Sequence, residues 1–328
     1  MKKKFAAFAA SAVAVSMLAF AGCGATADNG AGTIPGNYKE KSPEELATIV
    51  NDIDADKIFG DSKALNLGVK TDLSASMDLA GMSSTSFSIG LDYKMSASEA
   101  GINGQGSINF KSSETSGGQS ESNEFSGTVY HGGDFVYAAS GEEKIKINMS
   151  ELIAAFMPGG SDDIVTPTSF YEAQDAVSVA EVLALMQQFG VKITVDDSKG
   201  VKFKMSITEE TIWKIAETEG GDIADQIAQL KELVTFNKFK FDLYFALDEN
   251  GAFSAASFVT DIDATMNLGG AGSAPMAAEE APALSIKVKG YAEIYTHNDT
   301  VTVPDTVTGD ASYVDMTDAL IEMIKGMI

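Results

Sequence analysis

The sequence contains little cysteine and histidine and no arginine, and each shortage excludes a class of protein. A single cysteine among 328 residues cannot form an internal disulfide bond. The only two histidines, His131 and His297, lie near predicted turns, and no Gly-x-Ser-x-Gly nucleophile motif occurs. Because these residues select no catalytic or metal-binding arrangement, we expect a protein that is not an enzyme and needs no metal or cofactor.

All 23 basic residues are lysines, and 47 acidic residues bring the net charge to −24. A chain of this charge is repelled by nucleic-acid phosphates and by anionic lipid headgroups. We therefore exclude nucleic acid as a partner. Any attachment to a membrane is expected to depend on a separate anchor.

The N-terminal residues have the order of an export signal. Basic residues 2–4 precede an apolar run over residues 5–20, and small residues then lead to Cys23. Phe20-Ala21-Gly22-Cys23 resembles the bacterial lipobox, in which the thiol receives a diacylglyceryl group and becomes the new N-terminus. The resemblance implies a lipoprotein signal peptide over residues 1–22, lipidation at Cys23 and an extracytoplasmic protein anchored to the bacterial cell membrane.

Two other interpretations of this segment stay open. Ala19-Phe20-Ala21 also fits an A-x-A cleavage site, which would release a soluble secreted protein. An uncleaved anchor is the third possibility, although the run is short for a span of roughly 20 apolar residues. Removal of residues 1–22 would remove three lysines and no acid, so 20 lysines against 47 acids would give a net charge of −27.

The rest of the chain is predicted to be a flexible tether and one domain. Residues 23–41 are rich in Gly, Ala, Asn and Thr, which is typical of a tether. Residues 42–328 are assigned to one domain, because the two linker-like segments, 111–124 and 269–283, fall inside predicted hairpins. We expect both segments to be flexible loops.

Alternation of apolar and polar residues predicts long antiparallel strands in two groups, separated by helices. The predicted strands cover residues 65–79, 87–95, 102–110, 125–129, 135–137, 145–149, 239–247, 258–266 and 284–294, with a hairpin at 191–207. Helical spacing and capping residues predict helices over residues 42–53, 150–156, 178–189, 208–215, 222–234 and 315–324. Glycines at positions 90, 104, 106 and 127 are expected to bend the strands.

This order resembles that of LolA/LppX-type half-barrel lipoproteins and related uncharacterised lipoproteins. The resemblance covers roughly residues 42–328 and is clearest from Asp134-Phe135-Val136-Tyr137 to Met149. It implies an α+β fold, in which a curved antiparallel half-barrel of about ten strands wraps amphipathic helices. It also implies that the space between sheet and helices holds acyl chains or another apolar ligand.

Apolar residues of the long strands and of the last helix are the candidates for such a site. The residues chosen are Phe87, Ile89, Leu91, Phe239, Phe241, Leu243 and Met323, with Met316 and Met327 in or next to the same helix. Because a packed core needs the same alternation, these residues also fit a protein with no cavity. The alternative hypothesis is a surface module that binds a protein or an envelope polymer.

Overall fold

The computed structural model describes most of the predicted domain. Its described residues are 32–54, 57–58, 64–80, 82–98, 101–156, 179–219, 231–267 and 283–325. Cys23 and residues 269–282 therefore lie outside the described part of the chain.

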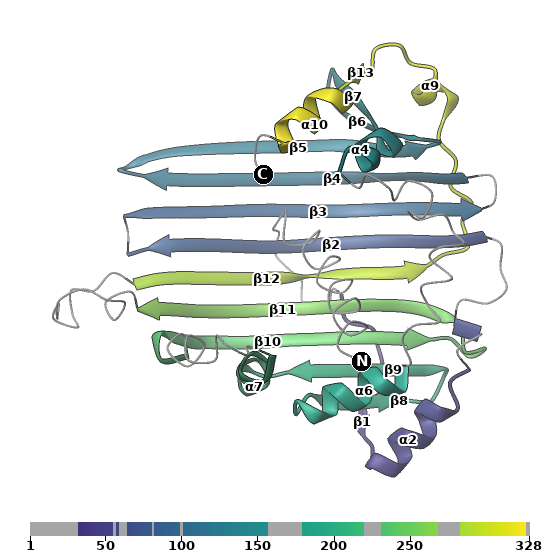
Figure 1. The fold of residues 1–328 in the computed structure, drawn as a ribbon, viewed down its shortest axis with the longest axis vertical. Helices are drawn as coiled ribbons and strands as arrows, with labels where there is room; N and C mark the ends of the chain where they lie inside the picture. Colours follow the sequence, from purple (N-terminus) through teal and green to yellow (C-terminus); the bar gives the residue numbers. More distant parts are fainter. Residues whose placement is uncertain are drawn as a thin grey trace.

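A single open sheet of thirteen strands dominates the described structure (Figure 1). All neighbouring strands are antiparallel except β13 and β7, which are parallel. The spatial order is β1-β8-β9-β10-β11-β12-β2-β3-β4-β5-β6-β7-β13. The bounds are β1 Lys39–Glu40, β2 Ala64–Leu79, β3 Ser83–Ser98, β4 Gly101–Ser116, β5 Gln119–Gly132, β6 Phe135–Ser140, β7 Glu143–Asn148, β8 Lys192–Asp196, β9 Val201–Ile207, β10 Val234–Leu247, β11 Phe253–Asn267, β12 Ala283–Thr296 and β13 Val314–Asp315.

The helices lie at the two ends of this sheet (Figure 1). One group lies by β8, β9 and β10 and contains α2, α6 and α7, whereas α4, α9 and α10 lie by β6 and β7. Their bounds are α2 Pro43–Asn51, α4 Met149–Phe156, α6 Val179–Gln188, α7 Glu209–Glu219, α9 Asp305–Thr308 and α10 Thr317–Lys325.

This architecture corrects the expected fold class. We predicted a half-barrel of about ten strands around helices, but the sheet is open and has thirteen strands, and the helices gather at its ends. The pairing of β12, β2, β3, β4 and β5 continues without a register shift. The two groups of predicted strands therefore meet side by side at the β12–β2 pair and form one continuous surface.

The strand glycines make room for side chains, whereas we expected them to bend the strands. A Cβ on Gly104 would lie 1.8 Å from the Tyr93 hydroxyl, and one on Gly106 would lie 2.3 Å from the Asp92 carbonyl oxygen. On the other face, a Cβ on Gly68 would lie 2.2 Å from the Tyr295 ring. These glycines let tyrosine rings and neighbouring backbone approach the strands closely.

Residues 111–124 form strand structure, which corrects their prediction as a flexible loop. They belong to the β4–β5 hairpin, whose turn, Gly117-Gly118, has φ values of 58° and 81°. Two consecutive residues with positive φ suit a tight hairpin turn, and glycine adopts them at little cost. Residues 119–126 are exposed, so backbone pairing forms this part of the hairpin without an apolar face to bury.

The described part of the predicted tether is also ordered. Residues 32–40 lie against the sheet, with Ile34 only 8% exposed and Lys39–Glu40 paired with β8. The domain therefore begins at or before Gly32, which corrects the boundary that we placed at residue 42. The capping box of α2 is confirmed, because Ser42 accepts from the Glu45 amide and Glu45 accepts from the Ser42 amide.

The sheet has an apolar and a polar face. The apolar face carries Leu73, Ile89 and Phe241, which pairing places in one row across the strands. The polar face carries Ser74, Ser88 and other residues of the opposite alternation. These two names are used below.

Candidate ligand-binding face

Strand pairing brings the six described strand candidates together on the apolar face. They occupy three neighbouring rows, each of which runs from β10 through β11, β12 and β2 to β3. The rows join Phe239 with Phe87, Phe241 with Ile89, and Leu243 with Leu91. Residues about 150 positions apart in the sequence therefore share one surface.

The centre of these rows is a packed apolar cluster. Leu73 is 3% exposed and Phe258 is 7% exposed, and the candidates Ile89, Phe241 and Leu243 pack against them. The Phe241 and Phe258 rings are stacked, with their centroids 5.8 Å apart and an angle of 8° between their planes. This cluster provides a firm apolar floor at the middle of the sheet.

Two helices cover the apolar face at its β8–β9 end. Leu46 of α2 and Leu183 of α6 pack on Val195 and Phe203, which are each 1% exposed. Next to them, Trp213 of α7 contacts Phe236, whose ring lies edge-on to Phe239 at a centroid distance of 5.1 Å. At this end the apolar residues form an ordinary packed core.

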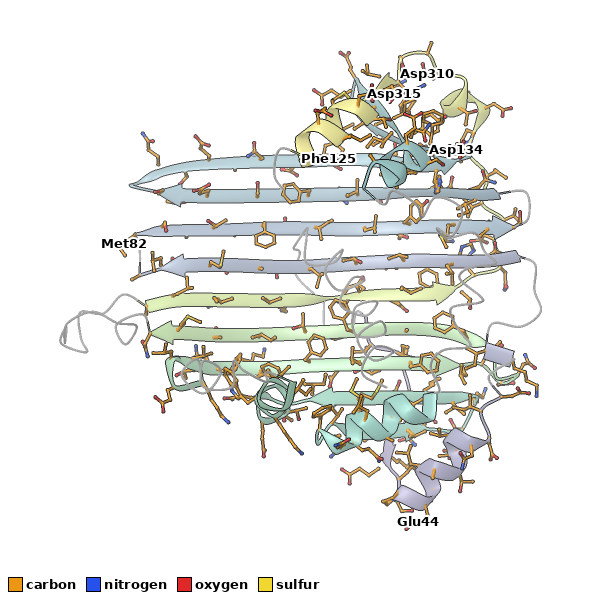
Figure 2. All side chains as sticks on the ribbon, viewed as in Figure 1. Glu44, Met82, Phe125, Asp134, Asp310 and Asp315 are labelled. Atoms are coloured by element: carbon orange, nitrogen blue, oxygen red, sulfur yellow. The ribbon has the colours of Figure 1, made fainter. Side chains whose placement is uncertain are left out.

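Towards β4 and β5 the apolar face becomes more exposed. Met77 on β2 is 43% exposed, and Phe125 on β5 (labelled in Figure 2) is 37% exposed. Phe125 continues the row of Phe241 and Ile89 through its pairing with Phe110. The apolar surface therefore extends well beyond the helices α2, α6 and α7.

Tyr93 on β3 and His131 on β5 add polar groups to the apolar face. Burial raises the pKa of the Tyr93 phenol to about 12. His131 lies half-buried near the end of β5, just before the turn at Gly133-Asp134 that we expected beside it. Burial lowers its pKa, although the Gly133 backbone and Asp134 oppose this effect. Both side chains are therefore predominantly neutral at pH 7.

The structure does not test the remaining candidates. Cys23 lies outside the described residues, and so does the side chain of Met323 in α10. Met316, directly before α10, is 38% exposed. The lipidation site and the methionine contribution thus stay predictions.

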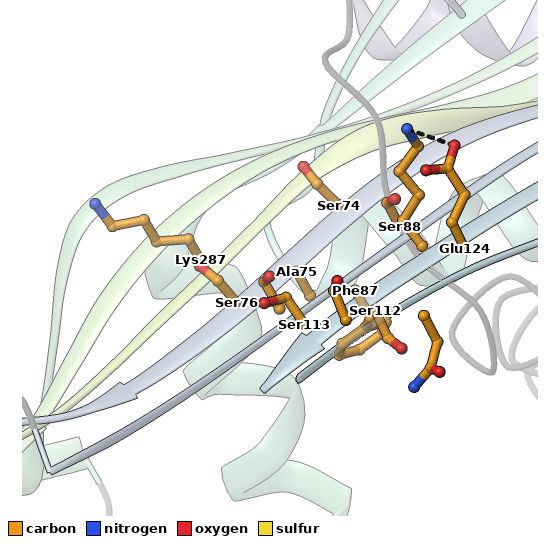
Figure 3. Close-up of a pocket in the computed structure, with 13 residues that line it drawn as sticks. Ser74, Ala75, Ser76, Phe87, Ser88, Ser112, Ser113, Glu124 and Lys287 are labelled. Carbon is orange, nitrogen blue, oxygen red and sulfur yellow. Dashed lines mark ion pairs between the residues drawn. The ribbon is translucent and has the colours of Figure 1, made fainter. Parts of the chain in front are cut away.

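An open groove of about 720 Å³ lies on the polar face (Figure 3). Hydroxyl groups dominate its walls, with Ser74 and Ser76 on β2 and Ser86 and Ser88 on β3. Lys111 and Glu124 form an ion pair of 2.7 Å across it. Because both ionic side chains are more than 60% exposed, this pair contributes little stability. Ala75 and the candidate Phe87 also contribute to its lining, and carbon atoms make up most of its accessible surface.

The described residues contain neither a group of metal ligands nor a membrane-spanning helix. Among them, no three His, Cys, Asp or Glu side chains are grouped so that they could hold a metal ion. Within the same part of the chain, no helix combines the length and the hydropathy needed to cross a bilayer.

Comparison with known proteins finds a distant structural likeness. No protein-family model matches the chain, and no curated protein matches it. The structure is similar to the crystal structure of LprF from Mycobacterium bovis over 80% of this chain and 97% of that chain. The two share 13% sequence identity, and the TM-score is 0.29. This likeness is too distant to assign a family or a function, so the resemblance to LolA/LppX-type proteins stays a prediction.

Proposed function

We propose that this chain is a non-enzymatic, extracytoplasmic lipoprotein, anchored through Cys23, that binds a lipid or another apolar molecule. The supporting observation is the apolar face, on which six candidates from β3 and β10 form three adjacent rows. An acyl chain lying along these rows would bury apolar surface of both ligand and protein. Each fully buried side chain of this size contributes roughly 1.5–3 kcal/mol.

The ligand would lie on the surface between the two groups of helices. The packed centre at Leu73 and Phe258 supplies a rigid floor, and the half-buried Phe87 and Leu91 flank it. A rigid apolar surface binds with little loss of its own conformational entropy. This proposal needs no enclosing half-barrel.

Binding of a fluorescent fatty acid to the protein produced from Gly24 onward tests the proposal. We expect saturable binding that Phe87→Ser weakens by roughly ten-fold, since it removes most of one apolar contact. Ser88→Ala, at the adjacent position on the polar face, is the matched control and should bind as the wild type does. Native mass spectrometry should detect co-purified lipid.

Absence of co-purified lipid together with no saturable binding would refute the ligand proposal. Equal binding by the Phe87 and Ser88 variants would place the ligand elsewhere. The alternative, a surface module for a protein or an envelope polymer, would then gain support from the hydroxyl-lined groove on the polar face.

A further inference from the structure

The chain enters the described structure on the polar face, close to the middle of the sheet. The Gly32 carbonyl accepts a hydrogen bond of 2.6 Å from the Ser257 hydroxyl on β11. A Cβ on Gly32, whose φ is +73°, would lie 2.3 Å from the Cβ of Tyr291 on β12. Residues 32–40, named the strap here, then cross the polar face to the β8 edge.

Several contacts hold the strap in place. Ile34 packs among aromatic residues of the polar face and is 8% exposed. The Tyr38 hydroxyl donates to the Ile34 carbonyl at 2.7 Å, and its ring lies edge-on to Tyr244 at 5.8 Å. The Asn37 amide donates to Asp196 at 2.9 Å, and Lys39–Glu40 pairs with β8. The strap therefore fixes the point at which the preceding residues leave the sheet.

The length of the intervening chain limits how the sheet can lie on a membrane. Nine residue steps separate Cys23 from Gly32, and a fully extended chain spans at most about 3.6 Å per residue, or roughly 32 Å. Tyr291 lies five residues from the nearer end of β12, which is about 17 Å along the strand. A tether that passed round this end to the apolar side would use most of its length. The direct path from a lipid at Cys23 leads to the polar face.

The polar face also differs in charge from the rest of the molecule. All twelve lysines in β2–β12 lie on it: one each on β2, β3, β4 and β8, and two each on β7, β9, β10 and β12. The same strands place nine carboxylates there, and Asp299 and Asp310 of the C-terminal segment pair with Lys94 and Lys144 of this face. Twelve lysines and eleven carboxylates give these groups a net charge of +1, whereas the whole chain carries −24.

Cross-strand ion pairs explain part of this arrangement, and they leave the lysines accessible. Lys287 lies 3.3 Å from Asp263, yet its side chain is 61% exposed. Lys240 lies 3.8 Å from Asp242 and is 47% exposed. Exposed pairs of this kind are weak and exchange readily with other counterions. Anionic headgroups close to this face would meet hydrated lysines.

We infer that the polar face is the membrane-facing surface of the anchored protein and that its lysines bind anionic lipid headgroups. This inference rests on the proposed anchor at Cys23. The strap fixes the point at which the preceding residues leave the sheet. The charge distribution favours this orientation when the polar face lies within the Debye length, about 8 Å, of the lipid headgroups. The apolar face would then point away from the membrane, where it is open to a ligand from the surrounding solution.

Quenching by a nitroxide headgroup lipid tests the orientation, with the acylated full-length protein on vesicles. Single cysteines replace Ser86 on the polar face or Met77 on the apolar face, both of which are exposed, and each carries a fluorophore. Lipidation blocks the native thiol of Cys23. We expect at least about two-fold stronger quenching at position 86, because side chains on the two faces of a strand point in opposite directions and only Ser86 would face the headgroups.

Lipid charge tests the role of the lysines. Replacing neutral phosphatidylcholine vesicles by vesicles with about 30 mol% phosphatidylglycerol should increase the difference in quenching, and about 1 M salt should remove that increase. The double variant Lys287→Glu/Lys289→Glu changes the charge of these groups on the polar face from +1 to −3 and should abolish the increase. Lys57→Glu/Lys199→Glu changes the total charge equally, off the polar face, and should preserve it.

The possible outcomes separate this inference from the proposed function. Equal quenching at positions 86 and 77, or stronger quenching at 77, refutes the orientation while the anchor stands. An increase that survives Lys287→Glu/Lys289→Glu, or no increase with phosphatidylglycerol, refutes headgroup binding by the lysines. A protein that associates with neither vesicle type refutes the anchor, and the orientation with it.

Discussion

Asp196 should make the stability of this protein depend on pH below about 4. Its carboxylate is 6% exposed and accepts hydrogen bonds from the Ser198 hydroxyl at 2.6 Å, the Asn37 amide at 2.9 Å and the Ser198 amide at 3.1 Å. These bonds, led by that of the Ser198 hydroxyl, lower the pKa of Asp196 from 3.8 to about 2. Each pKa unit corresponds to 1.36 kcal/mol, so the ionised carboxylate contributes about 2 kcal/mol.

Because the pKa of Asp196 is lowered in the folded state, the free energy of unfolding decreases as the pH falls. The contribution is complete above about pH 4, where Asp196 is ionised in both the folded and the unfolded protein, and it is lost as pH falls to about 2. Asp196→Asn keeps the shape but removes the charge and turns an amide group towards one of the donors. We expect the loss of stability relative to the wild type to be about 2 kcal/mol larger at pH 7 than at pH 2, where mainly the pH-independent cost of the amide group remains.

Urea unfolding of both proteins between pH 7 and pH 2, followed by circular dichroism, measures this difference. Other carboxylates titrate alike in both proteins, so the difference in the free energy of unfolding isolates Asp196. Glu249→Gln, in the exposed β10–β11 turn, is the control for loss of one charge and should be nearly neutral at every pH. A difference that is constant between pH 7 and pH 2, or that grows as pH falls, would refute the reasoning.

Three further substitutions test the packing of the sheet and the strap. Gly290→Ala should lower the free energy of unfolding by roughly 2–3 kcal/mol, as measured by urea unfolding. The cause is that φ at Gly290 is +146° and the new Cβ would lie 2.0 Å from the Asp72 carbonyl oxygen. Unchanged stability would contradict the close approach of β12 to β2. Phe258→Ala should cost about 3–5 kcal/mol in the same assay, and a loss below about 1 kcal/mol would show that the centre of the apolar face is not packed. Tyr38→Phe removes the bond to Ile34 and should cost about 1 kcal/mol. Hydrogen exchange at the Asn37 amide should then be faster than in the wild type, and an unchanged rate would argue against a role in holding the strap.

Local sequence patterns predicted individual elements well. Ser42 and Glu45 identified the start of α2, and alternation located the six strands β2 to β7 and the β8–β9 hairpin. These features depend on residues close together in the chain, so a linear reading finds them. The same reading also placed the strand candidates on one side of each strand, as the register shows.

The pairing of distant strands could not be predicted in the same way. The β12–β2 pair joins residues more than 200 positions apart, and it decides whether the sheet is one surface or two. Residues 111–124 lack apolar alternation, so nothing local distinguished them from a loop; the ladder with β3 and the Gly117-Gly118 turn order them. The segregation of the lysines was present in the alternation, as in Lys238 and Lys240 beside Phe239 and Phe241. The lysines of different strands share one face only because the register aligns them across neighbouring strands.

The two-residue strands β1 and β13 matter for the order in which the protein is made. An open sheet exposes unpaired backbone at its edges, and such edges recruit strands from other molecules. Here β1 pairs with the β8 edge and β13 with the β7 edge, where the Met316 amide also donates to the Lys146 carbonyl at 3.0 Å. The strand that covers β8 emerges before its partner, but the one that covers β7 emerges more than 160 residues after it. During synthesis, the β7 edge is therefore left without its cover until more than 160 further residues have emerged, and this is the interval in which a chaperone would protect the protein most.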